Sequence, residues 1–302
     1  MVRRALRALE ESGIDFSIRK GPRHDDELPL GGEIDLAVPR TQLRSTEGAL
    51  ATAGFKRLKA RGHPGHRFFV RAERGRWIKI DVKVDFTPAF GGGIGRFLSA
   101  FGRRLPLSFR RVGSIVAILG PDGAGKGAVV AALVERIPIG VDVVYLGSRR
   151  AQSHPDAGAA SERPLPKAAR EALWMFVRLL RTWGKLGGIY ARAWRGHVVL
   201  CDRHPIEVLA IRPRRRLPGF ERFLVRRLVP NPDAVVILDA PGEVLFERKR
   251  EHTSETLETW RRRYLEEFGD TAEVISSAGP IEDTVAEVSQ RVWHEVASRR
   301  RW

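Results

Sequence analysis

The sequence predicts an α/β protein of two units, the second of them a three-layer domain built on a parallel sheet. Its 302 residues are about twice the length of a typical single domain. The C-terminal part contains short, continuous apolar runs separated by helical patterns: SIVAILG, VDVVYLG, HVVLCD and DAVVILD. Such runs are typical of parallel strands that are buried on both faces of a sheet. The N-terminal part alternates helical and strand-like segments, which indicates a smaller α/β unit, with α+β as the alternative.

Residues 1–90 are expected to form the smaller unit. Their pattern predicts helices at 2–11 and 41–53, and strands in GGEIDLAV, HRFFVRA and RWIKIDVKVDF. Residues 91–111 contain GGGIG and further Gly, Pro and Arg residues that interrupt any sustained period, which predicts a linker. Residues 112–302 then form the second unit.

Composition limits the kinds of partner. The net charge of +17 favours a polyanion or a phosphorylated small molecule. Aromatic residues lie mostly within apolar runs instead of alternating with cations, so a nucleic acid is the less favoured partner. The one cysteine, Cys201, excludes a disulfide framework. Because no apolar run of about 18 residues and no signal-peptide pattern occur, we expect no membrane span and a cytoplasmic protein.

A glycine-rich segment follows the first apolar run of the second unit. The sequence GPDGAGKG, Gly120 to Gly127, lies between a predicted strand and a predicted helix, and we call it the glycine loop. Glycines in this context let backbone N–H groups converge on phosphate oxygens, and the lysine adds a positive charge for the outer phosphates. The residues expected to bind the nucleotide are Gly120, Asp122, Gly123, Ala124, Gly125, Lys126, Gly127 and Ala128.

The two residues after the loop lysine are Gly127 and Ala128, and neither offers a hydroxyl group to a magnesium ion. The metal would therefore be held by carboxylates and water. The candidate carboxylates are Asp122, Asp202 and Asp239.

Four segments of the second unit occur in a characteristic order. They are GPDGAGKG, VVLCDRH at Val198 to His204, NPDAVVILDAP, and the arginine-rich FERKREHTSETLETWRRRYLEEF. In this order, residues 114–300 resemble the thymidylate kinase family of P-loop nucleotide kinases. The resemblance implies a P-loop kinase fold with a parallel sheet, ATP as the phosphoryl donor and Mg²⁺ as the metal ion.

The resemblance also implies catalytic roles. Asp202 works near the metal, Arg203 holds the acceptor phosphate, and His204 takes the place of an aromatic residue. Arginines of the last segment form a mobile lid over the donor phosphates. The implied catalytic residues are Lys126, Asp202, Arg203, Arg248 and Arg250. The structural alternatives are an internal ion pair between Asp202 and Arg203, and solvated arginine-rich helix faces.

Carboxylates of the first unit form a second candidate site. Glu33 and Asp35 are two residues apart in one predicted strand, and Asp81 and Asp85 have the same spacing in another. Three carboxylates on adjacent strands can hold a pair of magnesium ions, so Glu33, Asp35 and Asp81 are the predicted metal ligands.

The glycine turn at Lys20 and Gly21, the later Gly-Gly and the acidic-x-Asp pattern make residues 12–90 resemble the nucleotidyltransferase fold. Glu33 replaces the more usual first aspartate, and the serine common near the glycine turn is absent. A degenerate, substrate-binding or regulatory domain is therefore the alternative to an active one.

The helical pattern at 170–186, REALWMFVRLLRTWGKL, is a weaker signal. Its apolar residues recur at helical spacing: Leu173, Phe176, Val177, Leu180 and Trp183. We interpret them as a face that packs in the core, with a membrane surface or a partner protein as the alternatives.

The predicted function is ATP-dependent phosphoryl transfer to a small nucleotide-, nucleoside- or phosphometabolite-type acceptor. The arginines of IRPRRRLPGF, at 211–220, are candidates for holding that acceptor if it is phosphorylated, and a solvated loop is the alternative. Two further functions stay open: metal-dependent nucleotidyl transfer with the second unit as a nucleotide sensor, and nucleotide-gated nucleic-acid binding. A homodimer is also left open.

Overall fold

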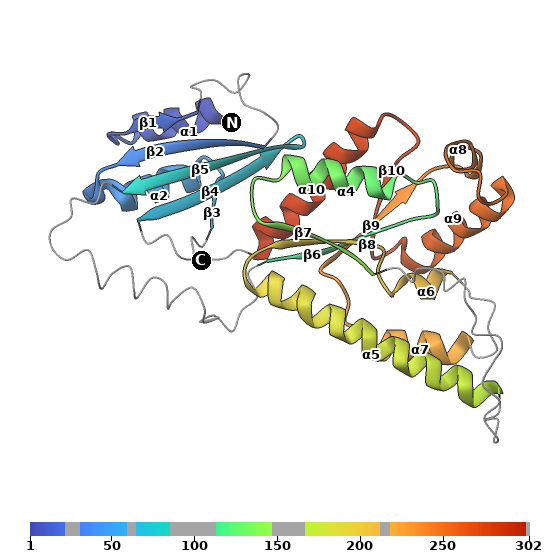
Figure 1. The fold of residues 1–302 in the computed structure, drawn as a ribbon. Coiled ribbons are helices and arrows are strands. Elements are labelled where there is room, and N and C mark those ends of the chain that lie inside the picture. The colour runs from blue at the N-terminus through green and yellow to red at the C-terminus, as the bar shows by residue number, and fades with distance from the viewer. Residues whose placement is uncertain (22–30, 59–64, 85–112, 147–166, 212–217, 300–302) are drawn as a thin grey trace.

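The computed structural model describes residues 1–21, 31–58, 65–84, 113–146, 167–211 and 218–299 (Figure 1). The strands in these ranges form two five-stranded sheets, one mixed and one parallel. The predicted mixed α/β class and the parallel sheet are thus confirmed. The predicted linker at 91–111 lies outside the described residues, so the division of the chain at that point stays a prediction.

The first sheet has the strand order β1-β2-β5-β4-β3. Its strands are β1 (Ser17–Lys20), β2 (Gly31–Val38), β3 (Lys56–Leu58), β4 (His66–Glu73) and β5 (Arg76–Val84). Strands β2 and β5 are parallel, and the other neighbouring pairs are antiparallel. Alternate residues of β5, Ile78, Ile80 and Val82, enter one apolar cluster with helices α1 (Val2–Glu11) and α2 (Leu43–Thr52). The short helix η2 (Arg40–Gln42) precedes α2. The residues between them on β5 face the opposite side of the sheet.

The second sheet has the order β10-β9-β6-β8-β7, and all its strands are parallel. Its strands are β6 (Ile115–Leu119), β7 (Val141–Tyr145), β8 (Val198–Asp202), β9 (Ala234–Asp239) and β10 (Glu273–Ser276). The four apolar runs of the sequence are β6 to β9, as predicted. β6 lies in the centre and is buried along its whole length. The carboxyl ends of β6, β8 and β9 therefore open on the same edge of the sheet.

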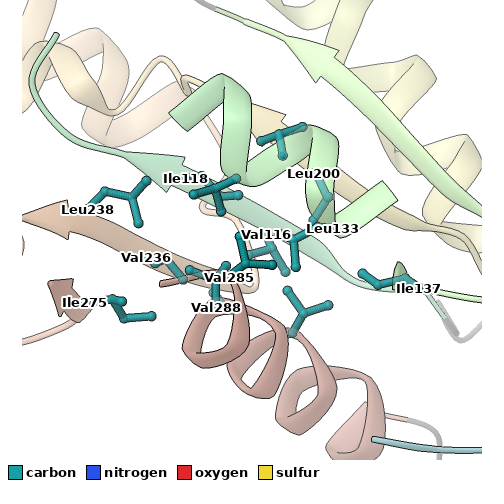
Figure 2. Close-up of a cluster of buried hydrophobic side chains, with 14 of the residues drawn as sticks. Val116, Ile118, Leu133, Ile137, Leu200, Val236, Leu238, Ile275, Val285 and Val288 are labelled. Carbon is teal, nitrogen blue, oxygen red and sulfur yellow. The ribbon is translucent and has the colours of Figure 1, made fainter. Parts of the chain in front are cut away.

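Helices cover both faces of this parallel sheet. They are α4 (Lys126–Arg136), α5 (Lys167–Trp194), α6 (Glu207–Ala210), α7 (Pro218–Leu228), α8 (Gly242–Arg248), α9 (Ser254–Phe268) and α10 (Ile281–Arg299). Figure 2 shows side chains of α4 and α10, among them Leu133, Val285 and Val288, meeting those of the strands on one face. A second cluster on the other face includes residues of α5, α7 and α9. The result is the three-layer arrangement expected from the sequence.

The first sheet packs against α10. Trp77 of β5 is completely buried and makes an edge-to-face contact with Trp293 of α10, with ring centroids 5.5 Å apart. At the β4–β5 turn, a Cβ on Gly75 would lie 2.8 Å from the Cα of Ala286, so only glycine allows this approach. Val70, Ala72 and Trp77 belong to the same apolar cluster as α4 and α10. One apolar cluster thus joins the first sheet to the helix that follows the glycine loop.

Helix α5 corrects one sequence interpretation. The five residues predicted to pack in the core are all exposed: Leu173, Phe176, Val177, Leu180 and Trp183. The buried face consists instead of Met175, Leu179, Leu186, Ile189 and Ala193. The prediction was wrong because the helix has apolar residues on two faces, and periodicity alone does not tell which of them meets the core. Within the described ranges, no helix is long and apolar enough to cross a membrane.

Candidate functional site

The glycine loop connects β6 to α4 at the carboxyl edge of the parallel sheet, as predicted. Gly123 has a φ of +90°, in the left-handed region that favours glycine. A Cβ at this position would also lie 2.5 Å from the carbonyl oxygen of Leu245 in α8. Gly125 precedes α4, also with a positive φ of 83°. The loop therefore has the close-packed, glycine-dependent backbone that a phosphate cradle needs.

Lys126 begins α4, and its side chain folds back into the glycine loop. The Nζ atom donates hydrogen bonds to the carbonyl oxygens of Gly120, at 2.7 Å, and Pro121, at 2.8 Å. Burial lowers the pKa of Lys126 to about 8, and the positive charge of Arg203 adds to this effect. The nearby carboxylates of Glu207, Asp122 and Asp202 act in the opposite direction. Lys126 thus lies among three acidic groups and one cation at the centre of the site.

Arg203 connects the end of β8 to the glycine loop. Its guanidinium forms an ion pair with the Asp122 carboxylate and lies 3.5 Å from Glu207. Arg203 has a φ of +66°, which is uncommon for a residue with a side chain. Burial alone would raise the pKa of the Asp122 carboxyl, but the charges of Arg203, Lys126 and Lys249 bring it below its ordinary value. The loop carboxylate is therefore held in its ionised form.

Asp202 is the last residue of β8 and is half-buried. Among the described residues, its carboxylate makes no ion pair with Arg203, which instead pairs with Asp122 and Glu207. The alternative of an internal ion pair between Asp202 and Arg203 is thus not what the structure shows. The next residue, His204, is buried, and burial lowers its pKa to about 4. It is neutral at physiological pH, and its Nδ1 accepts a hydrogen bond of 3.4 Å from the backbone N–H of Ile206.

The predicted lid arginines occupy different places. Arg248 donates hydrogen bonds to the carbonyl oxygens of Ser277, at 2.6 Å, and Ala278, at 3.3 Å. These acceptors follow β10, so the guanidinium closes a backbone turn. Arg250 is exposed in the turn after α8. Within the described part of the chain, neither arginine makes a hydrogen bond or an ion pair with the glycine loop.

Two neighbours of these arginines in the sequence, Lys249 and His252, approach the glycine loop. The charge of Lys249 acts on Asp122, and His252 Nε2 lies 4.0 Å from Asp122 Oδ2. The His252 ring also contacts Trp260 edge to face, with centroids 4.6 Å apart. Lys249 was visible in the sequence as part of the basic run, whereas no local signal marked His252.

Arg261 of α9 occupies the carboxyl end of β9. Its guanidinium binds Asp239 through two hydrogen bonds, Nε at 2.7 Å and Nη2 at 2.9 Å. A third bond, at 2.9 Å, goes to Glu258. Because both Asp239 oxygens are engaged by a cation, Asp239 is a poorer metal ligand than the sequence implied. Of the other predicted carboxylates, Asp122 has an oxygen within 4.8 Å of ligand atoms of Glu251 and His252, whereas Asp202 belongs to no such group among the described residues.

Sequence reasoning missed two further buried groups. Tyr264 of α9 donates a hydrogen bond to Glu207 of α6, at 3.1 Å. Burial raises the pKa of Glu207 above its ordinary value, against the opposing charges of Lys126 and Arg203. The only local signal was the spacing of four residues between Arg203 and Glu207. The candidate acceptor arginines at 212–216 lie outside the described residues.

The predicted carboxylates of the first unit come together on one face of the first sheet. Oxygen atoms of Glu33, Asp35 and Asp81 lie within 4.8 Å of one another, and we call these residues the acidic cluster. Asp35 of β2 and Asp81 of β5 are direct neighbours in the parallel ladder. Asp85 lies outside the described residues.

Each member of the acidic cluster has its own nitrogen partner: a lysine for Glu33 and for Asp35, and a histidine for Asp81. Lys79 Nζ donates to Glu33 at 2.6 Å, and Lys83 pairs with Asp35. His66 Nδ1 lies 2.9 Å from both oxygens of Asp81. The hydrogen bond to Asp35 is the largest cause that raises the pKa of Lys83. A metal ion bound here would compete with Lys79 and Lys83. Both lysines alternate with Asp81 along β5, so the period of a strand would have placed them on the same face.

No protein family model matches the chain, and no curated protein matches it. The arrangement of the residues themselves therefore carries the functional argument.

Proposed function

We propose that the protein transfers the γ-phosphoryl group of ATP to a small acceptor of the nucleotide, nucleoside or phosphometabolite type. One observation carries the proposal: at the carboxyl edge of a parallel sheet, the glycine loop pairs with Arg203 through Asp122 and holds the buried Lys126 through the carbonyl oxygens of Gly120 and Pro121. Ligands bind at this edge in open α/β sheets. Two cations within a glycine-rich cradle suit a reaction whose main demand is stabilisation of phosphate charge.

Lys126 supplies the first cation. Its bonds to the carbonyls of Gly120 and Pro121 hold the ammonium within the loop, beside the N-terminus of α4. Phosphate oxygens entering the loop would replace these neutral acceptors with charged ones, and hydrogen bonds to charged groups are the stronger kind. Lys126 thus changes partners on nucleotide binding and keeps its position.

Arg203 supplies the second cation and is the candidate for holding a phosphorylated acceptor. Its pairing with Asp122 and Glu207 fixes the guanidinium near Lys126. An acceptor phosphate would compete with Asp122 for the guanidinium, so acceptor and loop are coupled through this one residue. The planar donor fork of arginine suits bidentate phosphate binding.

A magnesium ion would be held by Asp202, assisted by water. Asp202 fits because it presents hard oxygen ligands at the strand end and is not engaged by Arg203. The ion, when bound, neutralises charge on the donor phosphates. Asp122 is the second candidate ligand, but binding a metal would weaken its ion pair with Arg203.

The experiment is an activity screen with ATP labelled in the γ-phosphate and a panel of nucleotides, nucleosides and phosphorylated metabolites. Transfer of the label to an acceptor, lost in Lys126→Ala and kept in the matched surface variant Lys56→Ala, would support the proposal. Lys56 is exposed on β3. Equal activity in both variants would contradict it.

We propose metal-dependent nucleotidyl transfer at the acidic cluster as the second candidate function. The observation that favours it is the convergence of three carboxylates from two adjacent strands within 4.8 Å. Release of pyrophosphate from a nucleoside triphosphate, lost in Asp35→Asn and kept in Lys126→Ala, would distinguish this reaction from the kinase reaction.

A further inference from the structure

Helix α5 has three chemically different faces. Its buried residues Leu179, Leu186 and Ile189 pack in the apolar cluster on one face of the parallel sheet. A second set, which we call the apolar stripe, shares another face because its members follow at steps of three and four residues: Leu173, Phe176, Val177, Leu180 and Trp183. A third set, which we call the basic flank, shares another face because its members are four and seven residues apart: Arg181, Lys185 and Arg192.

The side chains of the apolar stripe are unusually exposed to solvent for a globular protein. Leu173, Phe176 and Leu180 are 55%, 51% and 56% exposed. Scattered single exposed apolar residues are normal, whereas a contiguous row of them marks a contact surface. Helix α7, which contributes to the same buried cluster, adds the exposed side chains of Phe220 and Phe223. Figure 1 shows α5 along the lower, outer side of the molecule, and its buried side chains pack on the other face of the parallel sheet from those of α4 and α10.

We propose that the apolar stripe and the basic flank of α5 dock the protein on the surface of a membrane rich in anionic lipids. The apolar stripe would lie at the level of the headgroup–acyl boundary, and Arg181 and Lys185 would contact lipid phosphates. Arg192 of the basic flank already pairs with Asp142, at 3.4 Å, so a lipid phosphate would compete with that carboxylate. Trp183 suits this depth, because tryptophan prefers the interface between lipid and water. The combination of leucine, phenylalanine and tryptophan with a lysine- and arginine-rich side is typical of helices that lie in the membrane plane.

Charge complementarity favours an anionic membrane over a second copy of the chain or a nucleic acid. Helix α5 carries six Lys and Arg residues and one acidic residue, Glu171, and the whole chain has a net charge of +17. A second copy of the chain would bring further positive charge to a helix that is already basic. A nucleic acid would neutralise the positive charge of α5 but would offer no apolar surface to aliphatic residues such as Leu173, Val177 and Leu180. An anionic bilayer matches both the charge and the apolar residues.

The geometry of α5 favours surface docking over insertion. Because Met175, Leu179 and Leu186 are buried in the protein core, the helix cannot leave the fold without exposing them. The protein would therefore bind as a folded body, with the helix lying parallel to the membrane. The proposal does not depend on the kinase function.

The test is co-sedimentation of the full chain with vesicles of phosphatidylcholine alone and of phosphatidylcholine mixed with phosphatidylglycerol. We expect binding to the anionic vesicles only. Leu180→Gln with Trp183→Gln keeps the net charge and should weaken binding about tenfold, because the apolar contribution is lost. The matched control is Val134→Gln with Val143→Thr, which changes two exposed valines on α4 and β7.

A second pair of variants tests the basic flank. Arg181→Glu with Lys185→Glu should abolish binding to anionic vesicles, whereas Arg7→Glu with Lys56→Glu changes the net charge equally at exposed sites on α1 and β3 and should weaken it much less. All changed residues of α5 are exposed, so circular dichroism should show an unchanged fold.

Three results would overturn the proposal. The first is no binding to either kind of vesicle. The second is binding that depends on net charge alone and is the same for the apolar-stripe variant and its control. The third is a dimer in analytical ultracentrifugation that the apolar-stripe variant abolishes, without vesicle binding by the parent, which would assign the surface to a second copy of the chain.

Discussion

The indole N–H of Trp77 donates a hydrogen bond of 2.6 Å to the hydroxyl of Ser289, and both residues are completely buried. The two are separated by 212 positions in the chain. The bond joins the first sheet to α10, within the apolar cluster that also includes the inner face of α4. The acidic cluster and the glycine loop thus belong to parts of the fold that are packed on a common helix.

We expect Ser289→Ala to destabilise the protein by about 1–3 kcal/mol, because it leaves the buried Trp77 N–H without an acceptor. Trp77→Phe removes donor and ring volume together. In a double-mutant cycle the two changes should therefore be strongly non-additive. Urea unfolding followed by circular dichroism measures all four free energies. Simple additivity would show that the bond contributes nothing of its own.

The low pKa of Lys126 predicts that ATP affinity depends on pH. In the free protein burial lowers this pKa to about 8, from an ordinary 10.5, and bound phosphates would raise it again. Affinity should therefore be full below pH 8 and fall as the pH rises above it, because the free protein then loses the proton that binding requires. Calorimetric titration across this range measures the effect. Lys126→Arg keeps its charge throughout and should bind ATP with little change between pH 7 and 9; a matching decline in this variant would contradict the assignment.

Asp202→Asn is nearly isosteric and removes one charge. It should leave ATP binding largely intact and lower phosphoryl transfer by orders of magnitude, since metal positioning matters most when charge moves. Arg203→Ala should instead raise the KM of a phosphorylated acceptor. Single-turnover transfer of labelled phosphate separates the two effects. Asp270→Asn, at an exposed turn, is the control, and full activity of Asp202→Asn would remove Asp202 from the mechanism.

The acidic cluster makes a pair of predictions of opposite sign. Asp35→Asn should abolish Mn²⁺ binding at the cluster. Lys83→Met should strengthen it, because the ammonium that now pairs with Asp35 would no longer compete. Electron paramagnetic resonance titration without nucleotide, in a background that carries both Asp202→Asn and Asp122→Asn, isolates this site from the candidate metal ligands near the glycine loop. If neither change alters Mn²⁺ binding, the cluster is an ion-pair network and holds no metal.

Arg248 and Arg250 should behave differently despite their proximity. Arg248→Ala removes hydrogen bonds to the carbonyls of Ser277 and Ala278, so it should lower the melting temperature as well as activity. Arg250→Ala, at an exposed position, should leave the melting temperature unchanged. Any loss of phosphoryl transfer in Arg250→Ala then reports a role in the reaction. Calorimetry combined with the transfer assay makes the comparison.

Several features of the protein were determined by local sequence. The apolar runs of β6 to β9 and the glycine loop were identifiable because strand burial and a tight turn are encoded within a few consecutive residues. Glu33 and Asp35 could be placed on the same face of the sheet because side chains two residues apart in a strand point to the same side. These features required no knowledge of what packs against them.

Other features were decided only by the tertiary structure, because they depend on which distant element supplies a partner. Arg203 could have paired with its neighbour Asp202, yet the backbone at β8 directs it to Asp122 of the glycine loop. The apolar stripe of α5 has the period of a core helix, yet the sheet meets the opposite face. Periodicity gives the faces of a helix or strand, but only the packing of the remaining chain decides which face is covered.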